Sequence, residues 1–232
     1  MSLDPRLQPS ALFGEVSATV GARKDEVIEL GWPGLCPGRP RLILPNLDDS
    51  GSVALPGGGD PVGNRYGEIR LAFEALQAWC TCRRCLAGVL HFDTPDGDVD
   101  PGRLGSANFQ RQLARGLQEP GGGGTSLLGP SLDRAHEIAA QYPKHEVRLV
   151  ILTDWELFDS DGYIQRLLDF PGTVLAIGLN ATPPEALSSD SVASLRINHG
   201  DKPGAVARAL FGELTVGRRG RRSPATTRAG TA

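Results

Sequence analysis

Five side chains of this sequence carry oxygen atoms of the kind that a hard divalent cation needs, and they fall in three separate segments. The segment LDDSGS places Asp48, Ser50 and Ser52 at alternate positions after the apolar run RLILPN. Thr125 follows four consecutive glycines, and Asp154 lies in the segment LTDWELFD. Hard cations such as Mg²⁺ prefer oxygen ligands in octahedral geometry and keep some of their water. These residues therefore predict a site for one divalent ion, which the glycines would let the backbone approach closely.

Each of these pieces also has an ordinary structural explanation when it is taken alone. Ser50 and Ser52 are residue types of turns and helix N-caps, although the next clear helical pattern begins only at residue 65. Thr125 could cap the helix that follows it, and Asp154 could form a turn. We predict a metal site because all three pieces occur together, each at a strand end or in a glycine-rich loop.

The elements that must position these residues follow from the spacing of the apolar side chains. Short apolar runs predict buried strands at 41–47, 85–92, 146–154, 172–180 and 192–198. Helical spacing predicts helices at 65–79, 106–118, 161–170 and 202–215, and one after Thr125 that Gly129 and Pro130 interrupt. This alternation is typical of an α/β three-layer sandwich, a mostly parallel sheet with helices on both faces. Ligands of such sheets bind at the carboxyl ends of the strands, where Asp48 and Asp154 fall.

The pattern resembles the von Willebrand factor A (VWA) domain family and its metal-ion-dependent adhesion site (MIDAS). The family motif has DxSxS after the first strand, a Thr in a glycine-rich loop, and an Asp in a T-D-G-like turn. The matching residues here, in the family's order and within a resemblance that covers about residues 41–215, are Asp48, Ser50, Ser52, Thr125 and Asp154. One departure is Trp155, where the family often has Gly. An indole there is expected to flank the ion and contact what approaches it.

The resemblance implies a VWA fold and a single Mg²⁺ or Mn²⁺ whose shell is completed by an Asp or Glu of a partner protein. In this interpretation the ion is a bridge and the chain is not an enzyme. The sequence agrees, because no His or Lys lies in the motif segments to act as a base, and none of the four His is paired with a nucleophile. The alternative is a Mg²⁺-dependent phosphoryl-transfer hydrolase that uses Asp48 as nucleophile. Such enzymes usually carry a second acid two residues later, and that position is Ser50.

Composition narrows the class of protein. The 232 residues are 40% hydrophobic with a net charge of −3, which predicts one ordinary globular domain and no specific nucleic-acid partner. The start MSLDPRLQPS has no signal-peptide pattern and no apolar segment is long enough to span a membrane, so we expect a cytoplasmic location. Family members that work in multi-protein bacterial systems or with AAA-type ATPases suggest an intracellular bacterial adaptor. We expect an N-terminal extension packing on the domain (1–40), the VWA domain (41–216) and a disordered Arg-rich tail (217–232).

Four cysteines form a second group of candidate site residues. Cys80, Cys82 and Cys85 occur in CTCRRC, between the first helix and the second strand, and Cys36 precedes the first strand. In a parallel sheet these positions share the edge opposite the metal crevice, so all four can converge. The sequence leaves three alternatives open, which are a structural Zn²⁺ site, a disulfide, and thiols whose pKa the neighbouring arginines lower.

Overall fold

A six-stranded sheet forms the centre of the molecule. The computed structural model describes residues 16–19, 27–54, 58–80, 83–92, 94–118, 124–159 and 162–221. The strands follow the order β5-β4-β3-β6-β7-β8. They are β3 (Arg41–Leu47), β4 (Leu86–His91), β5 (Val99–Arg103), β6 (Glu146–Thr153), β7 (Thr173–Leu179) and β8 (Val192–Ile197). All neighbours pair in parallel except β5, which is antiparallel to β4 at one edge.

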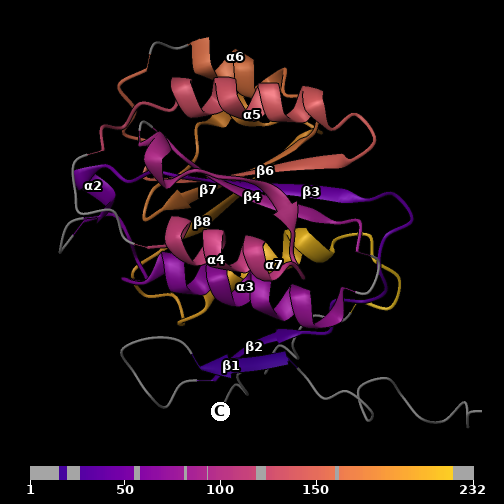
Figure 1. Cartoon of the computed structure of the whole chain (residues 1–232). Helices are drawn as coiled ribbons and strands as arrows, with labels where there is room; N and C mark the ends of the chain where they lie inside the picture. The colour runs from indigo at the N-terminus through magenta and orange to yellow at the C-terminus, as the bar shows by residue number, and fades with distance from the viewer. Residues whose placement is uncertain are drawn as a thin grey trace, which may run out of the picture.

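Helices cover both faces of this sheet (Figure 1). One face carries α3 (Arg65–Trp79), α4 (Ala107–Gly116) and α7 (Ala205–Thr215), and the other carries α5 (Gly129–Gln141) and α6 (Gly162–Leu168). Each layer has its own apolar core, one against each face of the sheet. Because β3, β6 and β7 are buried on both faces, their side chains are apolar without alternation. The predicted three-layer α/β sandwich is confirmed.

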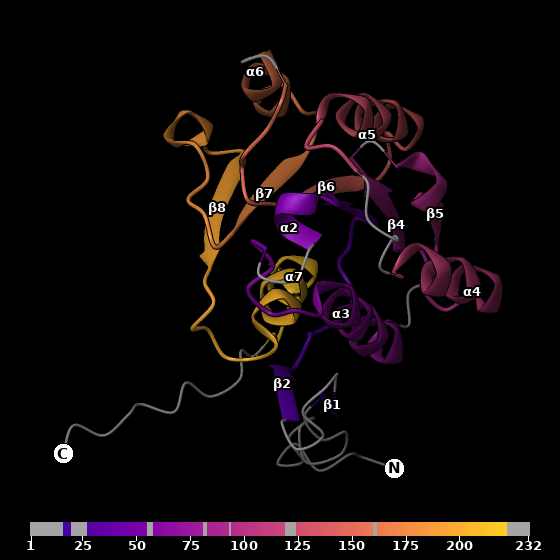
Figure 2. The same ribbon diagram turned by 90° about the vertical axis from the view of Figure 1, so that its left-hand side faces the viewer.

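The pairing of β3 with β6 brings the two acidic strand ends together. Their register is parallel from Arg41 opposite Glu146 to Leu47 opposite Leu152. The Asp48 N–H continues it by donating to the Leu152 carbonyl at 3.1 Å. A short helix, α2 (Gly51–Ala54), follows at this edge and faces the viewer in Figure 2. The loops after β3 and β6 therefore lie side by side.

The helix after Thr125 begins later than predicted. Helix α5 starts at Gly129 and has Pro130 in its first turn, so the expected interruption by these two residues is wrong. Proline is tolerated there because the first turn of a helix has no partner for its N–H groups. The Asp159 carboxylate accepts the N–H groups of Leu128 at 2.6 Å and Gly129 at 2.9 Å. Residues 125–128 are thereby left as a loop.

The segments outside the expected domain contribute to the fold. Strands β1 (Val16–Thr19) and β2 (Val27–Gly31) form an antiparallel pair. Ile28 and Leu30 of β2 belong to the core cluster that also contains the buried side of α7. Toward the C-terminus, Arg218 is buried and the Arg219 carbonyl accepts the Leu35 N–H at 2.9 Å. The expected domain bounds stay predictions. Residues 222–232 of the expected disordered tail lie outside the described residues. Among the residues that the structure describes, no helix is long and apolar enough to cross a membrane.

Candidate metal-binding site

Asp48 lies at the base of the candidate site and is completely buried. Its Oδ1 accepts the Ser50 N–H at 2.9 Å, and its Oδ2 accepts the Thr153 hydroxyl at 2.5 Å. Burial raises the pKa of Asp48; the hydrogen bonds from Thr153 and Ser50 oppose that rise, while the charge of Asp154 adds to it. The environment of Asp48 therefore disfavours the ionised carboxylate, and a nearby cation would stabilise the ionised form.

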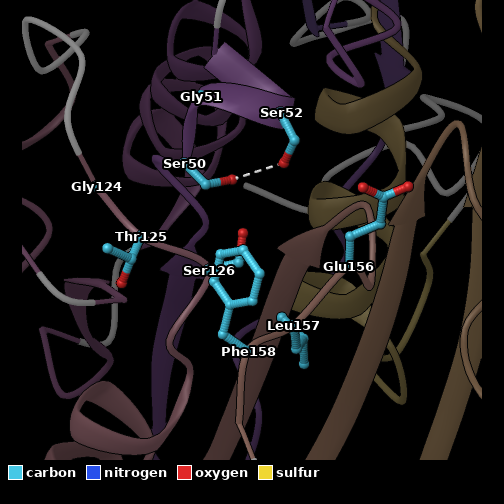
Figure 3. A pocket seen from close by; sticks show the side chains of 9 residues that line it. All are labelled: Ser50, Gly51, Ser52, Gly124, Thr125, Ser126, Glu156, Leu157 and Phe158. Atoms are coloured by element: carbon cyan, nitrogen blue, oxygen red, sulfur yellow. Dashed lines mark hydrogen bonds between the residues drawn. The ribbon is translucent and has the colours of Figure 1, made fainter.

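Two hydroxyls lie together just after Asp48 in the sequence. The Oγ atoms of Ser50 and Ser52 are 3.0 Å apart and face each other (Figure 3). Adjacent ligands of an octahedral Mg²⁺ are separated by about 3.0 Å, which is the ion–oxygen distance of about 2.1 Å multiplied by √2. The same distance suits a hydrogen bond, so the pair holds this spacing without an ion.

The glycine-rich loop reaches the site through a backbone contact. Ser50 and Gly124 form an isolated parallel bridge, which brings Thr125 beside the strand end although it is distant in sequence. A pocket of about 390 Å³ opens there. Its lining residues are Ser50, Gly51, Ser52, Gly124, Thr125, Ser126, Glu156, Leu157 and Phe158 (Figure 3). Three of the five predicted ligands thus share one pocket.

The two predicted carboxylate ligands are not among the lining residues of that pocket. Asp48 is completely buried, and the Oδ1 of Asp154 accepts the Glu156 N–H at 3.1 Å. Gly59 passes close to Asp154, because a Cβ on Gly59 would lie 3.2 Å from the Asp154 Cβ. An ion held by all five residues therefore requires the Asp154 carboxylate to reach it from the side of the pocket, directly or through water.

Trp155 has a backbone conformation that glycine adopts more readily than other residues. Its φ is 62°, in the left-handed region, and its N–H donates to the Thr153 hydroxyl at 3.1 Å. The half-buried ring packs against the apolar core on the α5 and α6 side. The predicted contact between this indole and a partner stays a prediction, because Trp155 does not line the pocket. The exposed aromatic ring at the pocket is that of Phe158.

A buried ionic network that sequence reasoning missed lies next to the candidate ligands. Asp49 is 1% exposed and accepts hydrogen bonds from Arg65, Tyr66 and His91. Arg65 also donates to the Asp48 carbonyl at 3.0 Å, which ties the network to the end of β3. In the sequence, the adjacency of Asp48 and Asp49 indicates that the Asp49 side chain points away from the site. It does not indicate which residues bind Asp49.

His91 is the cationic partner of Asp49. Its Nδ1 faces the Asp49 carboxylate and its Nε2 faces the Gly116 carbonyl at 2.9 Å, so both nitrogens must donate and the ring carries a charge. Burial lowers the pKa of His91, but the hydrogen bond and charge of Asp49 raise it overall. Burial likewise raises the pKa of Asp49, while His91, Tyr66 and Arg65 lower it overall. The pair is thus a buried ion pair.

The cysteines come together in part. The Sγ atoms of Cys36 and Cys80 are 3.9 Å apart. This is too long for a disulfide bond and close to the separation of about 3.8 Å between two thiolates on one tetrahedral Zn²⁺. Cys85 is buried, and Cys82 lies outside the described residues. No three His, Cys, Asp or Glu side chains within the described ranges are grouped to hold a metal ion, so zinc at the cysteines stays a prediction.

Comparisons with known proteins rest on structure alone. No protein-family model matches the sequence, and no curated protein matches it. Among solved structures, the pilus adhesin SpaC from Lactobacillus rhamnosus GG is similar over 78% of this chain, with a TM-score of 0.57 and 13% identity. A von Willebrand factor type A protein from Catenulispora acidiphila is similar over 76% of this chain, with a TM-score of 0.56 and 15% identity.

A third similar structure is proximal thread matrix protein 1 from the mussel byssus, described as having a zinc-occupied MIDAS motif. It matches 78% of this chain with a TM-score of 0.50 and 16% identity. The matches span 31%, 42% and 48% of these three longer proteins. At these identities the likeness is one of fold, and the fold of this chain is that of VWA domains.

Proposed function

We propose that this chain, which has a VWA fold, is a metal-dependent protein–protein interaction module. Mg²⁺ or Mn²⁺ would bind at Asp48, Ser50, Ser52, Thr125 and Asp154, and an Asp or Glu of another protein would complete its shell. The observation that carries the proposal is the Ser50–Gly124 bridge, which brings the glycine-rich loop to the strand end that carries a pair of hydroxyls and the buried Asp48 carboxylate. Such a set of oxygens from three separated segments suits a hard cation.

The residues of the site have distinct parts in this function. Asp48 would supply a charge held in position by Thr153 and the Ser50 N–H. Ser50 and Ser52 supply neutral oxygens at the spacing of octahedral ligands. Two carboxylates balance the charge of a divalent ion, so a third carboxylate would be held by direct coordination at an open position of the shell. The zinc-occupied MIDAS motif named for proximal thread matrix protein 1 supports metal binding by a domain of this fold.

Binding is favoured over hydrolysis by the state of Asp48. A nucleophilic carboxylate must reach its substrate, but Asp48 is completely buried and both of its oxygens accept hydrogen bonds. The adjacent Asp49 is held by Arg65, Tyr66 and His91 and cannot serve as the second acid. No observation on the described residues favours the phosphoryl-transfer alternative, and we assign no catalytic residue.

The cellular setting is a separate part of the proposal. We propose an adaptor in the cytoplasm of a bacterium, associated with an ATPase or another multi-protein system, with no membrane or specific nucleic acid as partner. In-cell crosslinking followed by identification of the captured proteins tests this part. Capture of cell-surface components alone would contradict it and leave the metal-dependent function standing.

The metal-dependent function is tested by capture from native lysate with Mg²⁺ and with EDTA in parallel. The expected result is a protein retained only with Mg²⁺ and lost with Asp48→Ala or Asp154→Ala. Asp190→Ala is the matched control, because Asp190 is exposed and lies away from the pocket. Equal retention with EDTA, or by the Asp48 variant, would show that the partner does not bind through the ion.

A further inference from the structure

An exposed aromatic side chain lies at the candidate metal site. The described residues include three exposed large apolar side chains, and Phe158 is the most exposed of them, at 78%. It lines the same pocket as the Ser50 and Ser52 hydroxyls (Figure 3). Contact of such a ring with water is unfavourable, and aromatic side chains are enriched in protein interfaces relative to the rest of the surface.

The backbone of Phe158 is held firmly by the loop that carries Thr125. The Phe158 N–H donates to the Ser126 carbonyl at 3.0 Å. The next residue, Asp159, accepts the N–H groups of Leu128 and Gly129 at the start of α5. The ring is therefore presented on a backbone fixed from both sides, and less entropy is lost when a partner covers it.

An acidic residue of the pocket lining restricts the charge of a ligand. Glu156 is exposed and lies in the same pocket, one residue from Leu157 and two from Phe158. One carboxylate on a ligand can coordinate the ion at its open position, but a second would lie near Glu156 without a cation to pair with. Like charges within one pocket repel each other, so a ligand with a second carboxylate would bind more weakly than a ligand with one.

We propose that the partner segment is an acidic residue beside a large apolar residue, and that the apolar side chain packs on Phe158 and Leu157. This inference rests on the proposed metal bridge, which would hold the acid. It adds that a single acid with an apolar neighbour binds better than a run of acids. Phe158 is then the residue that determines specificity, because aromatic side chains contribute strongly to interface energy when a partner buries them.

The test is selection of phage-displayed random peptides on the full chain with Mg²⁺, followed by elution with EDTA. The expected peptides carry one Asp or Glu next to Phe, Leu, Ile, Met or Trp. A selected peptide is then titrated beside two variants, one with Ala for the apolar residue and one with a second acid. Each variant, and the protein variant Phe158→Ala, is expected to bind about tenfold more weakly. The peptide variant with Ala for its apolar residue and the protein variant Phe158→Ala remove the two sides of one contact. Their losses in affinity should therefore not add when the two variants are combined.

Leu35→Ala is the control for loss of an exposed apolar side chain, since Leu35 is 66% exposed and lies at the other end of the sheet. It is expected to bind like the original chain. Peptides that elute with EDTA but lack apolar neighbours, or that bind Phe158→Ala equally well, would overturn this inference and leave the metal bridge intact. Peptides retained in EDTA and by Asp48→Ala would overturn the metal bridge itself. Recovery of no peptide would overturn the inference for linear segments.

Discussion

At the scale of single residues, the candidate site is held in an arrangement that disfavours its own charge. Asp48 is buried, close enough to Asp154 to feel its charge, and its pKa is raised for these reasons. A carboxyl whose folded pKa is raised lowers the stability of the fold once the pH is high enough to ionise it. Binding sites commonly contain such unfavourable groups, because the ligand supplies the compensation.

Asp48→Asn is therefore expected to raise the melting temperature in EDTA by a few degrees while abolishing the response to Mg²⁺. The amide has nearly the shape of the carboxylate but no charge to desolvate. Thermal unfolding of the two proteins, each with EDTA and with Mg²⁺, measures both effects. A variant that melts lower in EDTA would mean that the carboxylate is a structural hydrogen-bond acceptor before it is a ligand.

At the scale of elements, buried charges connect the sheet to its helices. His91 of β4 and Asp49 after β3 form an ion pair beneath the N-terminus of α3, with Arg65 and Tyr66 of that helix as further donors. The raised pKa of His91 adds stability that is fully present below about 6.5, the usual pKa of His in an unfolded chain. That stability is lost as the pH rises through the folded pKa.

We expect the melting temperature to fall as the pH is raised from about 6 to about 10. His91→Gln should melt lower at pH 6, because it removes one side of a buried ion pair, and should lose most of this pH dependence. The matched control is His199→Gln, since His199 is exposed. Unfolding followed across the pH series decides the matter, and an unchanged pH slope in His91→Gln would assign the dependence to other groups.

A second buried charge joins α3 to α7. The Glu68 carboxylate of α3 accepts the N–H groups of Gly204 at 2.7 Å, Val206 at 2.9 Å and Ala207 at 3.1 Å. It thus acts as an N-cap supplied by another helix, where the helix dipole favours a negative charge. This contact holds the start of α7 against the core.

Glu68→Ala is expected to lower the free energy of unfolding by about 2–3 kcal/mol, because three N–H groups lose their acceptor in a buried place. Glu74→Ala serves as the control, since Glu74 lies on the same helix but is largely exposed. Its ion pair with Arg70, at 3.9 Å, is a surface pair that contributes little to stability. Urea unfolding of both variants gives the comparison. Equal effects would mean that the loss comes from helix α3 and not from the cap of α7.

At the scale of the whole molecule, ion binding would couple three distant segments of the chain. Residues 48–52 follow β3, residues 124–125 lie between α4 and α5, and Asp154 follows β6, so an ion held by all three segments binds only the folded state. A ligand of this kind stabilises the fold by mass action. The effect is therefore a measure of the site that needs no knowledge of the partner.

Mg²⁺ at about one hundred times its dissociation constant should stabilise the fold by about 2.7 kcal/mol. For a domain of this size that corresponds to a rise of roughly 5–10 °C in the melting temperature. EDTA should reverse it, and Asp154→Ala should remove it. The same rise in Asp154→Ala would place the ion elsewhere on the chain.

Local patterns in the sequence were sufficient for the five parallel strands and the longer helices, but they did not predict the edge strand β5 or the short helix α2. The apolar runs of β3, β6 and β7 are continuous because both faces of these strands are covered, and α3 has the predicted bounds because its apolar positions recur at helical spacing. The kinds of ligand atoms were also evident, because hard cations need oxygen and the oxygens follow strand ends. The spacing of apolar residues and the kinds of ligand atoms are properties of short segments, so both can be predicted from the sequence.

The tertiary structure alone decided which of these side chains meet and which way each one faces. The Ser50–Gly124 bridge joins segments far apart in sequence, and no local pattern encodes it. The left-handed turn at Trp155 directs the indole to the core and leaves Phe158 at the pocket. Asp49 has the same residue type as its neighbour Asp48, yet it points into a network with His91. Contacts of this kind depend on backbone angles and on packing between distant segments, which are set only when the whole chain folds.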